Sequence, residues 1–505
     1  MKRLIILMGM VLSISLGHAQ TRKNRLQHAF DEIRREMHED FQNFRRQCME
    51  EFIGFLRDPW KEFEEEKPVP KPHDDEIPPV PIKDEKKDKP IKDEEKDKPI
   101  KDEEKQLEDK PVVIEEVVEP EPVEPQPQPV EPIEEVPVVE VKYVDFTFFG
   151  TSAKVRFDIA NKVVLHGVDE NSVADALKQM SAEAYDNMIR DCLSLRDSLK
   201  LCDWAYLQML KSLADKIYGK GTNGAALLLA NLYVQSGYKM RLATDGSKLY
   251  MLYASKYMIY DQNSFTVDGT SYYGVENLPA NLFISRAVFP KERELSLGIY
   301  TDQQFAQGRT KEVERRSTRY PAVGCTVRLN QNLIDFFGTY PTSMVGGNFM
   351  TRWAMYANTP LCHDVKQQLY PMLRQRIAGK TANAAVAVLL DFVQMAFPYG
   401  YDDEIWGHDR AFFAEESLWY ERCDCEDHAI LFSRLVRDLV GLKVVLVYYP
   451  GHLATAVHFP EAVTGDYLEL NGERFVVCDP TYFGAPIGMT MDGMDNKTAK
   501  VILLQ

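Results

Sequence analysis

Apolar side chains between residues 20 and 66 recur at spacings of three and four, a pattern typical of an amphipathic helical segment. Because an apolar stripe needs a partner, we expect this segment to pack on its own folded chain, to self-associate, or to dock on another protein. In a self-associated form, Cys48 could bridge two copies. The stripe consists of Leu26, Phe30, Ile33, Met37, Phe41, Phe44 and Cys48, and continues more loosely through Phe52, Phe55, Trp60 and Phe63.

A shorter apolar run stands at the start of the chain. Leu4–Leu16 follows Lys2 and Arg3, and Gly17-His18-Ala19 places small residues at positions −3 and −1 of a cut after Ala19. This arrangement predicts that residues 1–19 are a signal peptide and that the protein is exported, either periplasmic or secreted. The run is too short to span a bilayer. No later segment has eighteen consecutive apolar residues, so we expect no transmembrane segment.

Residues 67–141 show neither helical nor strand periodicity. They contain 16 of the 28 prolines, no glycine, 24 acidic and 12 basic side chains, and Pro-Ile-Lys-Asp-Glu recurs at 81, 90 and 99. Proline stiffening and charge repulsion predict a disordered Pro/Glu/Lys-rich linker. The linker carries −12 of the formal net charge of −17, so the folded residues are nearly neutral. Binding to nucleic acid therefore has little electrostatic support.

Helical and strand patterns return after residue 141, and several short matches recur at offsets of 186 to 204 residues. We expect an α+β fold of two tandem units, 142–322 and 323–505, each with helices packed on a small antiparallel sheet. The growing offset places about 18 extra residues near 400–420 of the second unit. The matched pairs are Phe148-Phe149-Gly150-Thr151 with Phe336-Phe337-Gly338-Thr339, Gln208-Met209 with Gln394-Met395, Gly237 and Lys239 with Gly441 and Lys443, and the hairpin turns Asp268-Gly269 and Asn471-Gly472.

Three residues of the second unit form a candidate catalytic set. Cys425 begins an apolar run with helical spacing, and the free amides at a helix start stabilise a thiolate and could hold an oxyanion. His452 heads a strand of small and apolar residues, and Asp479 follows the second strand of a hairpin. This order suits a thiol nucleophile, a base that takes its proton, and a carboxylate that orients the base.

At these residues the chain resembles the transglutaminase-like, papain-related thiol enzymes. Their pattern has Gly-x-Cys-x-Asp-x-Ala at a helix start, Gly after that helix, His at a strand head, and Asp-Pro-Thr after a hairpin. Cys425, Gly441, His452 and Asp479-Pro480-Thr481 fall on it, within roughly residues 360–505. The segment 448–452 looks like exported members from Bacteroides-type bacteria. Two departures are Cys423, where Gly is usual, and the missing aromatic residue two positions after His452.

The resemblance implies a Cys-His-Asp site for amide hydrolysis or acyl transfer on a peptide or protein substrate. No cofactor and no metal are expected, and calcium is not implied because no twelve-residue carboxylate loop is visible. A metal site at Cys423, Cys425 and His428 lacks a second ligand pair at structural-zinc spacing. Taken singly, a buried cysteine is usually an inert apolar residue and a strand histidine is usually structural. Cys423 and His458 compete for the nucleophile and base roles, but only Cys425 has Asp at +2 and Ala at +4.

Eight cysteines in an exported protein favour disulfides, yet a free Cys425 leaves an odd number. Cys192 with Cys202, and Cys325 with Cys362, could pair, and the sequence does not decide between these arrangements.

The first unit lacks the candidate set. At the same offset Cys425 falls on Gly221, His452 on Lys248 and Asp479 on Glu276, so we expect a degenerate copy without this chemistry.

The extra residues before Cys425 are rich in aromatic side chains and predict either the wall of a substrate cleft or a packing cluster. The candidates for the cleft wall are Trp406, Phe412, Phe413 and Trp419. The sequence thus favours an exported cysteine peptidase, amidase or acyltransferase, with a non-catalytic scaffold of the cell envelope as the alternative. A peptidoglycan hydrolase is a third, weaker reading.

Overall fold

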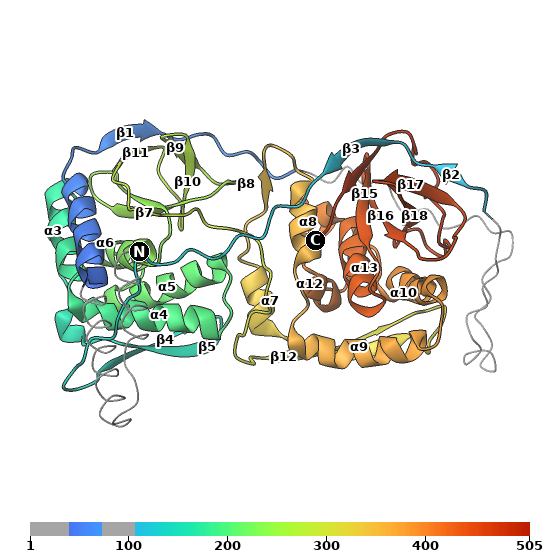
Figure 1. Cartoon of the computed structure of the whole chain (residues 1–505), viewed down its shortest axis with the longest axis horizontal. Helices are drawn as coiled ribbons and strands as arrows, with labels where there is room; N and C mark the ends of the chain where they lie inside the picture. The colour runs from blue at the N-terminus through green and yellow to red at the C-terminus, as the bar shows by residue number, and fades with distance from the viewer. Residues whose placement is uncertain (1–39, 73–106) are drawn as a thin grey trace, which may run out of the picture.

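A computed structural model describes residues 40–72 and 107–505. The predicted signal peptide, the first part of the predicted helical segment, and residues 73–106 of the predicted linker lie outside these ranges. The described residues form two lobes side by side, each with a curled sheet packed against helices (Figure 1). The predicted α+β composition is therefore confirmed.

The first lobe contains a six-stranded antiparallel sheet packed on four helices. The central helix of this lobe is α6 (Asn223–Gln235), which packs on α5 and β7 and is buried along most of its length. The strand order is β1 (Lys61–Glu64), β11 (Asn281–Ile284), β6 (Met240–Thr244), β7 (Leu249–Ala254), β10 (Thr270–Gly274) and β9 (Ser264–Val267). The other helices are α3 (Glu170–Met180), α4 (Asp186–Ser198) and α5 (Asp203–Tyr218), with short 3₁₀ turns at Ile159–Asn161 and Glu183–Tyr185.

The second lobe contains a seven-stranded sheet, and its central helix is α13 (Cys425–Leu439), which packs on α8, α10, α12 and β16. The strand order is β2 (Lys110–Pro111), β17 (Asp466–Leu470), β18 (Glu473–Cys478), β16 (His452–His458), β15 (Val444–Tyr449), β19 (Ala499–Ile502) and β3 (Ile114–Val118). The other helices are α8 (Thr351–Asn358), α9 (His363–Ile377), α10 (Ala382–Ala396), α11 (Asp402–Ile405) and α12 (Ala414–Trp419).

The two sheets share the order of five strands. The first runs β11-β6-β7-β10-β9, and the second runs β19-β15-β16-β18-β17. The predicted hairpin turns lie between the last two strands of each series. Asp268, Gly269, Asn471 and Gly472 all have positive φ, as tight two-residue hairpin turns require.

Smaller elements join the lobes and correct two details of the predicted organisation. The hairpin of β12 (Thr310–Arg316) and β13 (Gly324–Asn330) spans residue 322, so no boundary separates two units there. Phe148 and Thr151 lie in the hairpin of β4 (Tyr143–Phe148) and β5 (Thr151–Arg156), whereas their sequence matches lie in and after helix α7 (Gln331–Phe337). A four-residue match was too short to indicate structure. The remaining pair is β8 (Tyr257–Ile259) with β14 (Ser343–Val345).

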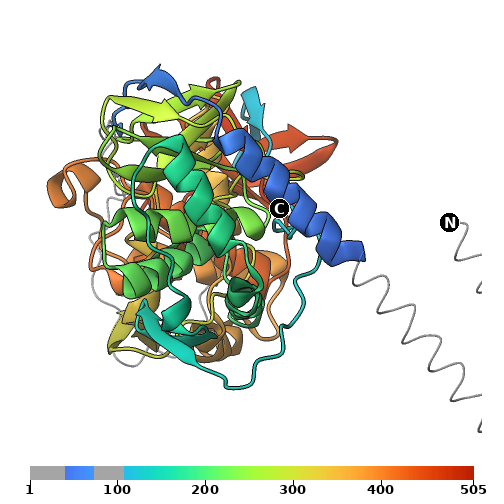
Figure 2. The same ribbon diagram turned by 90° about the vertical axis from the view of Figure 1, so that its left-hand side faces the viewer.

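The described part of the N-terminal segment is a helix over residues 40–56, which lies along the outside of the first lobe (Figure 2). Cys48, Phe52 and Leu56 are buried there, and Phe52 meets Phe289 edge-on with ring centroids 5.6 Å apart. Arg45 forms a buried ion pair with Asp186 at 2.5 Å. The protein's own fold therefore covers only part of the stripe, because Phe41, Phe44 and Phe55 are 37%, 42% and 56% exposed. Burial of Cys48 removes the bridge between copies that we considered.

Residues 107–118 close the sheet of the second lobe. β2 pairs in parallel with β17 at one edge, and β3 pairs in parallel with β19 at the other. Between them, Val112 N donates to the Tyr467 carbonyl and Val113 N to the Asn496 carbonyl, both at 2.6 Å. Because consecutive residues bond to both edges, the sheet curls into a closed ring around a core that includes Val112, Val447 and Phe475.

The first lobe is closed in the same manner by residues 61–66. β1 pairs with β11 at one edge, and Glu66 bridges to Ser264 of β9 at the other. The side chains enclosed by this sheet include Leu252 and Phe265, with Phe63 packed against them. In both lobes, a segment distant in sequence supplies the strand that completes the ring.

Residues 107–141 thus differ from the disordered linker predicted over 67–141. Beyond β3 the chain crosses to the first lobe (Figure 1), where Gln126 Nε2 donates to the Leu201 carbonyl at 2.7 Å. Asn187 exchanges two hydrogen bonds with the Val136 backbone. Val118, Val130 and Ile133 are buried. Composition indicated disorder because the segment cannot form a core alone. Residues 110–118 are ordered by both edges of one sheet, and residues 126–136 by hydrogen bonds to the first lobe.

Candidate active site around Cys425, His452 and Asp479

Cys425 is the first residue of α13, directly after the helix cap. The Asp424 carboxylate accepts from Asp427 N at 3.1 Å, and the Asp427 carboxylate accepts from Asp424 N at 3.3 Å. This reciprocal capping fixes where the helix begins and therefore where the thiol lies. Cys425 is 4% exposed, at the end of the helix where unpaired amides and the dipole favour an anion.

His452 is the first residue of β16. It pairs with Tyr449 across a two-residue turn in which Gly451 has φ of 77°, a conformation that favours glycine. The side chain is 1% exposed, and Nε2 lies 2.8 Å from Asp479 Oδ2. With Nε2 engaged by the carboxylate, Nδ1 is the ring nitrogen through which a thiol proton would be exchanged.

Asp479 directly follows β18 and is held by a dense set of donors. Its Oδ1 accepts from Thr481 N at 3.0 Å, Thr481 Oγ1 at 2.9 Å and Tyr482 N at 3.2 Å. Burial opposes ionisation of this carboxyl, but the charge of His452 and these hydrogen bonds outweigh burial and lower its pKa below the ordinary value. The carboxylate is thus prepared to orient a histidine ring and to stabilise its cationic form.

The elements that carry the three residues pack together. Helix α13 packs on β16, and β16 pairs with β18 through Thr455 and Cys478. The charge of Asp479 also affects the pKa of His428, the fourth residue of α13. Burial lowers the pKa of His428, while its bonds to the Asp424 and Phe397 carbonyls and the charge of Asp479 raise it. The charge of Asp479 therefore reaches the first turn of α13.

The competing residues lie in structural surroundings. Burial and the charge of Asp427 raise the pKa of the Cys423 thiol well above its ordinary value, and its Sγ lies 3.6 Å from the Ser417 carbonyl. His458 stands at the far end of β16, where Nδ1 lies 2.9 Å from the Arg474 carbonyl. Both ring nitrogens of His428 face backbone carbonyls, which leaves no nitrogen to ligate a metal beside Cys423.

All eight cysteines lie within the described residues, and no disulfide joins any two of them. The two pairings that we considered, Cys192 with Cys202 and Cys325 with Cys362, are thus not formed. Burial raises the pKa of Cys202 and Cys325 to about 12, so these thiols stay protonated near neutral pH.

The aromatic residues of the extra loop pack mainly in the interior. Phe412 and Phe413 are each 1% exposed, and Phe413 stacks on Phe337 with centroids 4.3 Å apart. Trp406 and Trp419 are partly exposed, and the Arg410 guanidinium lies 4.1 Å from the Trp406 ring centroid. For Phe412 and Phe413 the packing interpretation describes the structure, whereas a substrate-binding role of Trp406 and Trp419 stays a prediction.

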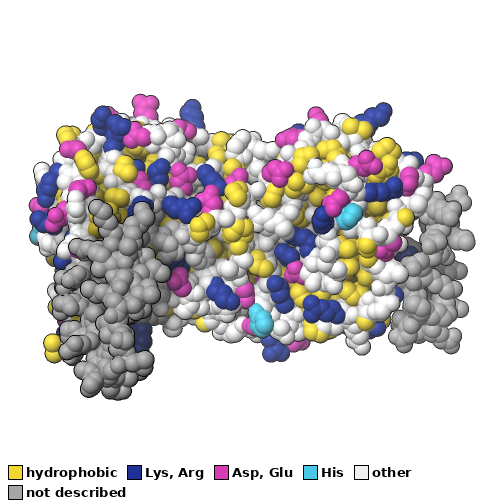
Figure 3. Space-filling view, in the orientation of Figure 1, with side chains coloured by type: hydrophobic (Ala, Val, Ile, Leu, Met, Phe, Trp, Pro, Cys, Tyr) yellow, Lys and Arg dark blue, Asp and Glu magenta, His cyan; other side chains and the backbone are white. Residues whose placement is uncertain are grey.

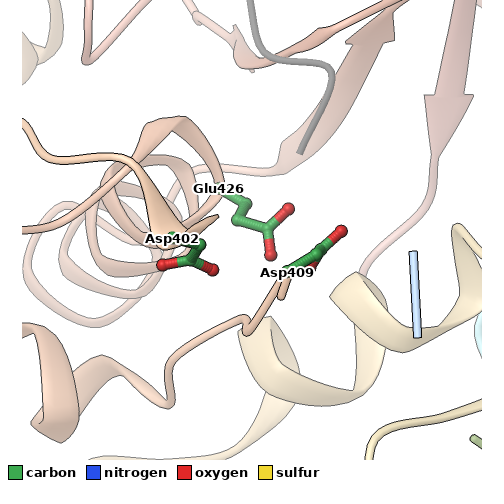
Figure 4. Close-up of side chains that lie close together, drawn as sticks. All are labelled: Asp402, Asp409 and Glu426. Carbon is green, nitrogen blue, oxygen red and sulfur yellow. The ribbon is translucent and has the colours of Figure 1, made fainter. Parts of the chain in front are cut away.

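The same loop brings together three carboxylates that sequence reasoning did not combine. Among the described residues, Asp402, Asp409 and Glu426 are close enough to hold a metal ion, with one oxygen from each within 4.8 Å of the others (Figure 4). Burial and the charge of Asp409 raise the pKa of Glu426 well above its ordinary value. The acidic run at 402–404 is visible in the sequence, but its approach to the residue after Cys425 depends on the loop.

The residues of the first lobe that match the candidate set also form a pair. Lys248 directly precedes β7, Glu276 follows β10, and Lys248 Nζ lies 2.7 Å from Glu276 Oε2. Gly221 lies one residue before Thr222, the cap of α6. A small pocket lined by Gly221, Thr222 and Glu276 lies beside this helix start. A thiol and an imidazole are absent from these three positions.

The surface and the comparisons with known proteins give no independent assignment. Acidic and basic side chains are interspersed over the face in Figure 3, without a continuous basic patch. In the part of the chain that the structure describes, no helix has the length and apolarity needed to cross a bilayer. No family model, curated protein or solved structure matches the chain.

Proposed function

We propose that the protein is a transglutaminase-like thiol enzyme that cleaves, or transfers acyl groups at, amide bonds of peptides or proteins. Cys425 is the nucleophile, His452 the base and Asp479 the residue that orients the base. The observation that carries the proposal is the buried contact of 2.8 Å between His452 Nε2 and Asp479 Oδ2, where His452 begins the strand that packs on the helix starting with Cys425.

The chemistry follows from the roles of these groups. His452 takes the thiol proton through Nδ1, and the Cys425 thiolate attacks the amide carbonyl carbon. The carbon–nitrogen bond breaks as His452 returns the proton to the leaving amine, which leaves an acyl-enzyme. Water or a second amine then attacks the thioester carbonyl, His452 accepts its proton, and the thiolate is released. The first amides of α13 are positioned to stabilise the developing oxyanion.

The proposal includes the descent of both lobes from one unit. Its support is the shared order of five strands, the equivalent hairpin turns, and the helix that precedes the sheet in each lobe. Lys248 and Glu276 then occupy the positions of His452 and Asp479 in a lobe that has lost the nucleophile. We propose that this lobe orients the second lobe or binds substrate, and that the protein acts outside the cytoplasm.

The decisive experiment combines thiol reactivity with a substrate search. Alkylation of Cys425 by iodoacetamide should be fast, and its rate should reach half of its maximum at a pH well below about 8.5, the ordinary thiol pKa. A digest of a broad peptide library should give products with the wild type and none with Cys425→Ala. Slow alkylation of Cys425 together with identical digests would reject the enzyme.

A non-catalytic scaffold is the second candidate, and the burial of the candidate residues favours it. Cys425, His452 and Asp479 are 4%, 2% and 1% exposed, so a substrate needs access that these side chains do not have in this conformation. In this reading the pair of His452 and Asp479 only stabilises the fold. The alkylation experiment separates the two functions, because an inaccessible structural thiol reacts slowly at every pH that preserves the fold.

A further inference from the structure

Three carboxylates from separate parts of the second lobe converge beside α13. Asp402 is the first residue of α11, Asp409 belongs to the following loop, and Glu426 is the second residue of α13. One oxygen from each lies within 4.8 Å of the others, and Figure 4 shows the three groups turned toward one another. Asp402 and Glu426 are 2% and 4% exposed, so water does not screen their mutual repulsion.

The hydrogen bonds around the group leave two of its oxygens without a partner. Asp402 Oδ2 accepts from Arg410 N at 2.5 Å, and Glu426 Oε2 accepts from Trp353 Nε1 at 2.7 Å. Asp409 Oδ1 and Glu426 Oε1 are buried and have no hydrogen-bond partner in the structure. A buried carboxylate oxygen without a donor is costly, and a cation is the ligand that satisfies several such oxygens at once.

The net charge of the group and its neighbouring guanidinium also favours binding of a divalent cation. Arg352, whose side chain is 1% exposed, pairs with Asp409 and lies 3.6 Å from Glu426. The Arg410 guanidinium is engaged by Glu416 at 2.6 Å, outside the group. Three carboxylates and one guanidinium carry a net charge of −2 when ionised, and a single divalent ion neutralises it.

We propose that Asp402, Asp409 and Glu426 bind a Ca²⁺ ion that ties the 402–409 loop to the start of α13. Calcium binds oxygen ligands at about 2.3–2.6 Å, so ligand oxygens across the ion lie up to about 5 Å apart. Calcium also tolerates flexible geometry and several carboxylate ligands, which suits three carboxylates contributed by separate segments. Magnesium, with ligands at about 2.0–2.1 Å, demands near-ideal octahedral geometry and usually keeps several waters, with only one or two carboxylates. Because Glu426 directly follows Cys425, the ion fixes the helix start that carries the thiol.

Binding is tested on the full chain by calorimetry with Ca²⁺ alone after treatment with a chelator. One ion per chain is expected. Ca²⁺ at about a hundredfold excess over its Kd should raise the melting temperature by roughly 3 °C or more. Terbium, which replaces calcium at oxygen sites, should give luminescence on tryptophan excitation, because Trp353 donates directly to one ligand. These readouts do not depend on any enzymatic activity.

Two variants locate the site. Glu426→Gln and Asp409→Asn should each weaken Ca²⁺ binding by at least about tenfold, since each removes a charged ligand at nearly constant shape. The matched control is Glu404→Gln, the same change at an exposed position of α11, which should bind as the wild type does. Circular dichroism without metal establishes that each variant folds.

The proposal is overturned if the wild type binds no Ca²⁺ at millimolar concentration. It is equally overturned if terbium luminescence is the same in Glu426→Gln, Asp409→Asn and the wild type. A melting temperature that is insensitive to both Ca²⁺ and chelator would show that Arg352 and a shared proton are sufficient to stabilise the group. The chelator experiment uses only the wild type, so it stands even if a variant fails to fold.

Discussion

Each lobe places a basic and an acidic side chain together at the end of its sheet, but the two pairs differ in how deeply they are buried. In the first lobe, Lys248 and Glu276 meet at 2.7 Å with side chains 33% and 39% exposed. In the second, His452 and Asp479 meet at 2.8 Å with both side chains 1% exposed. An exposed ion pair contributes about 0–1 kcal/mol to stability and has no further consequence. A buried histidine–carboxylate pair controls which nitrogen carries the proton, so burial distinguishes a surface contact from a site suited to chemistry.

The helix starts that accompany these pairs differ in the same sense. α6 begins after a threonine cap beside a small pocket, and Gly221 offers no side chain there. α13 begins after a reciprocal aspartate cap and places a buried thiol at its first position. Each lobe has a capped helix start and a pair of basic and acidic side chains beside its sheet, while a thiol and an imidazole occupy these positions only in the second. The following predictions test this difference, beginning with the largest effect.

Replacing the thiol should have the largest effect. Cys425→Ala is expected to lower kcat/KM on any substrate found in the library by about 10³-fold or more, because the acyl-enzyme cannot form. Steady-state kinetics on that substrate measure the loss. Cys423→Ala is the matched control and should keep turnover per folded molecule, since its thiol is buried against the Ser417 carbonyl. Equal losses in the two variants would contradict the assignment of the nucleophile.

Asp479→Asn should lower kcat by about 10²- to 10⁴-fold with a smaller change in KM, because the amide cannot hold the same tautomer or stabilise the imidazolium. The pH dependence of alkylation at Cys425 should shift as well, which a purely structural role would not produce. Turnover close to that of the wild type would mean that His452 acts without its carboxylate partner.

The low pKa of Asp479 predicts an acid-sensitive contribution to stability. A carboxyl whose pKa is lower in the folded state stabilises the protein above its unfolded pKa, near 3.9. That contribution is lost as the pH falls below about 4 through the folded pKa. The free energy of unfolding, measured with urea, should fall more between pH 5 and pH 3 for the wild type than for Asp479→Asn. Equal losses in the two proteins would show that ionisation of Asp479 does not contribute to the acid sensitivity.

The segments that close the two sheets give a smaller effect. Val112 is 5% exposed inside the second sheet, so Val112→Ala should lower the free energy of unfolding by roughly 1–2 kcal/mol. Its neighbour Val113 is 53% exposed, and Val113→Ala should change stability by less than about 0.5 kcal/mol. Indistinguishable urea midpoints would show that residues 107–118 do not form part of the fold in solution.

The smallest effect is expected in the first lobe. Glu276→Gln breaks an exposed ion pair, so it should cost less than about 1 kcal/mol and leave turnover unchanged. Lys248→Met should behave in the same way. A loss of turnover as large as that of Cys425→Ala in either variant would mean that the first lobe takes part in the reaction.

Local sequence determined much of what surrounds the site. The Asp268-Gly269 and Asn471-Gly472 turns, the start of α13 at Cys425 and the start of β16 at His452 all depend on residues close in the chain, such as a capping carboxylate or a glycine that permits positive φ. His452 and Asp479 come together because the strand that begins with His452 pairs with the strand that ends just before Asp479. Signals of this kind are readable because the interactions span only a few residues, or one pair of neighbouring strands.

Only the tertiary structure decided the rest. Residues 110–118 became two strands because a distant sheet offered unpaired backbone groups at both edges, which no feature of their own composition reveals. Phe412 and Phe413 were buried by α7 and neighbouring rings, and Asp402, Asp409 and Glu426 were brought together by a loop that folds back onto α13. Burial and convergence depend on contacts between residues far apart in sequence, so the chain must be folded before either can be known.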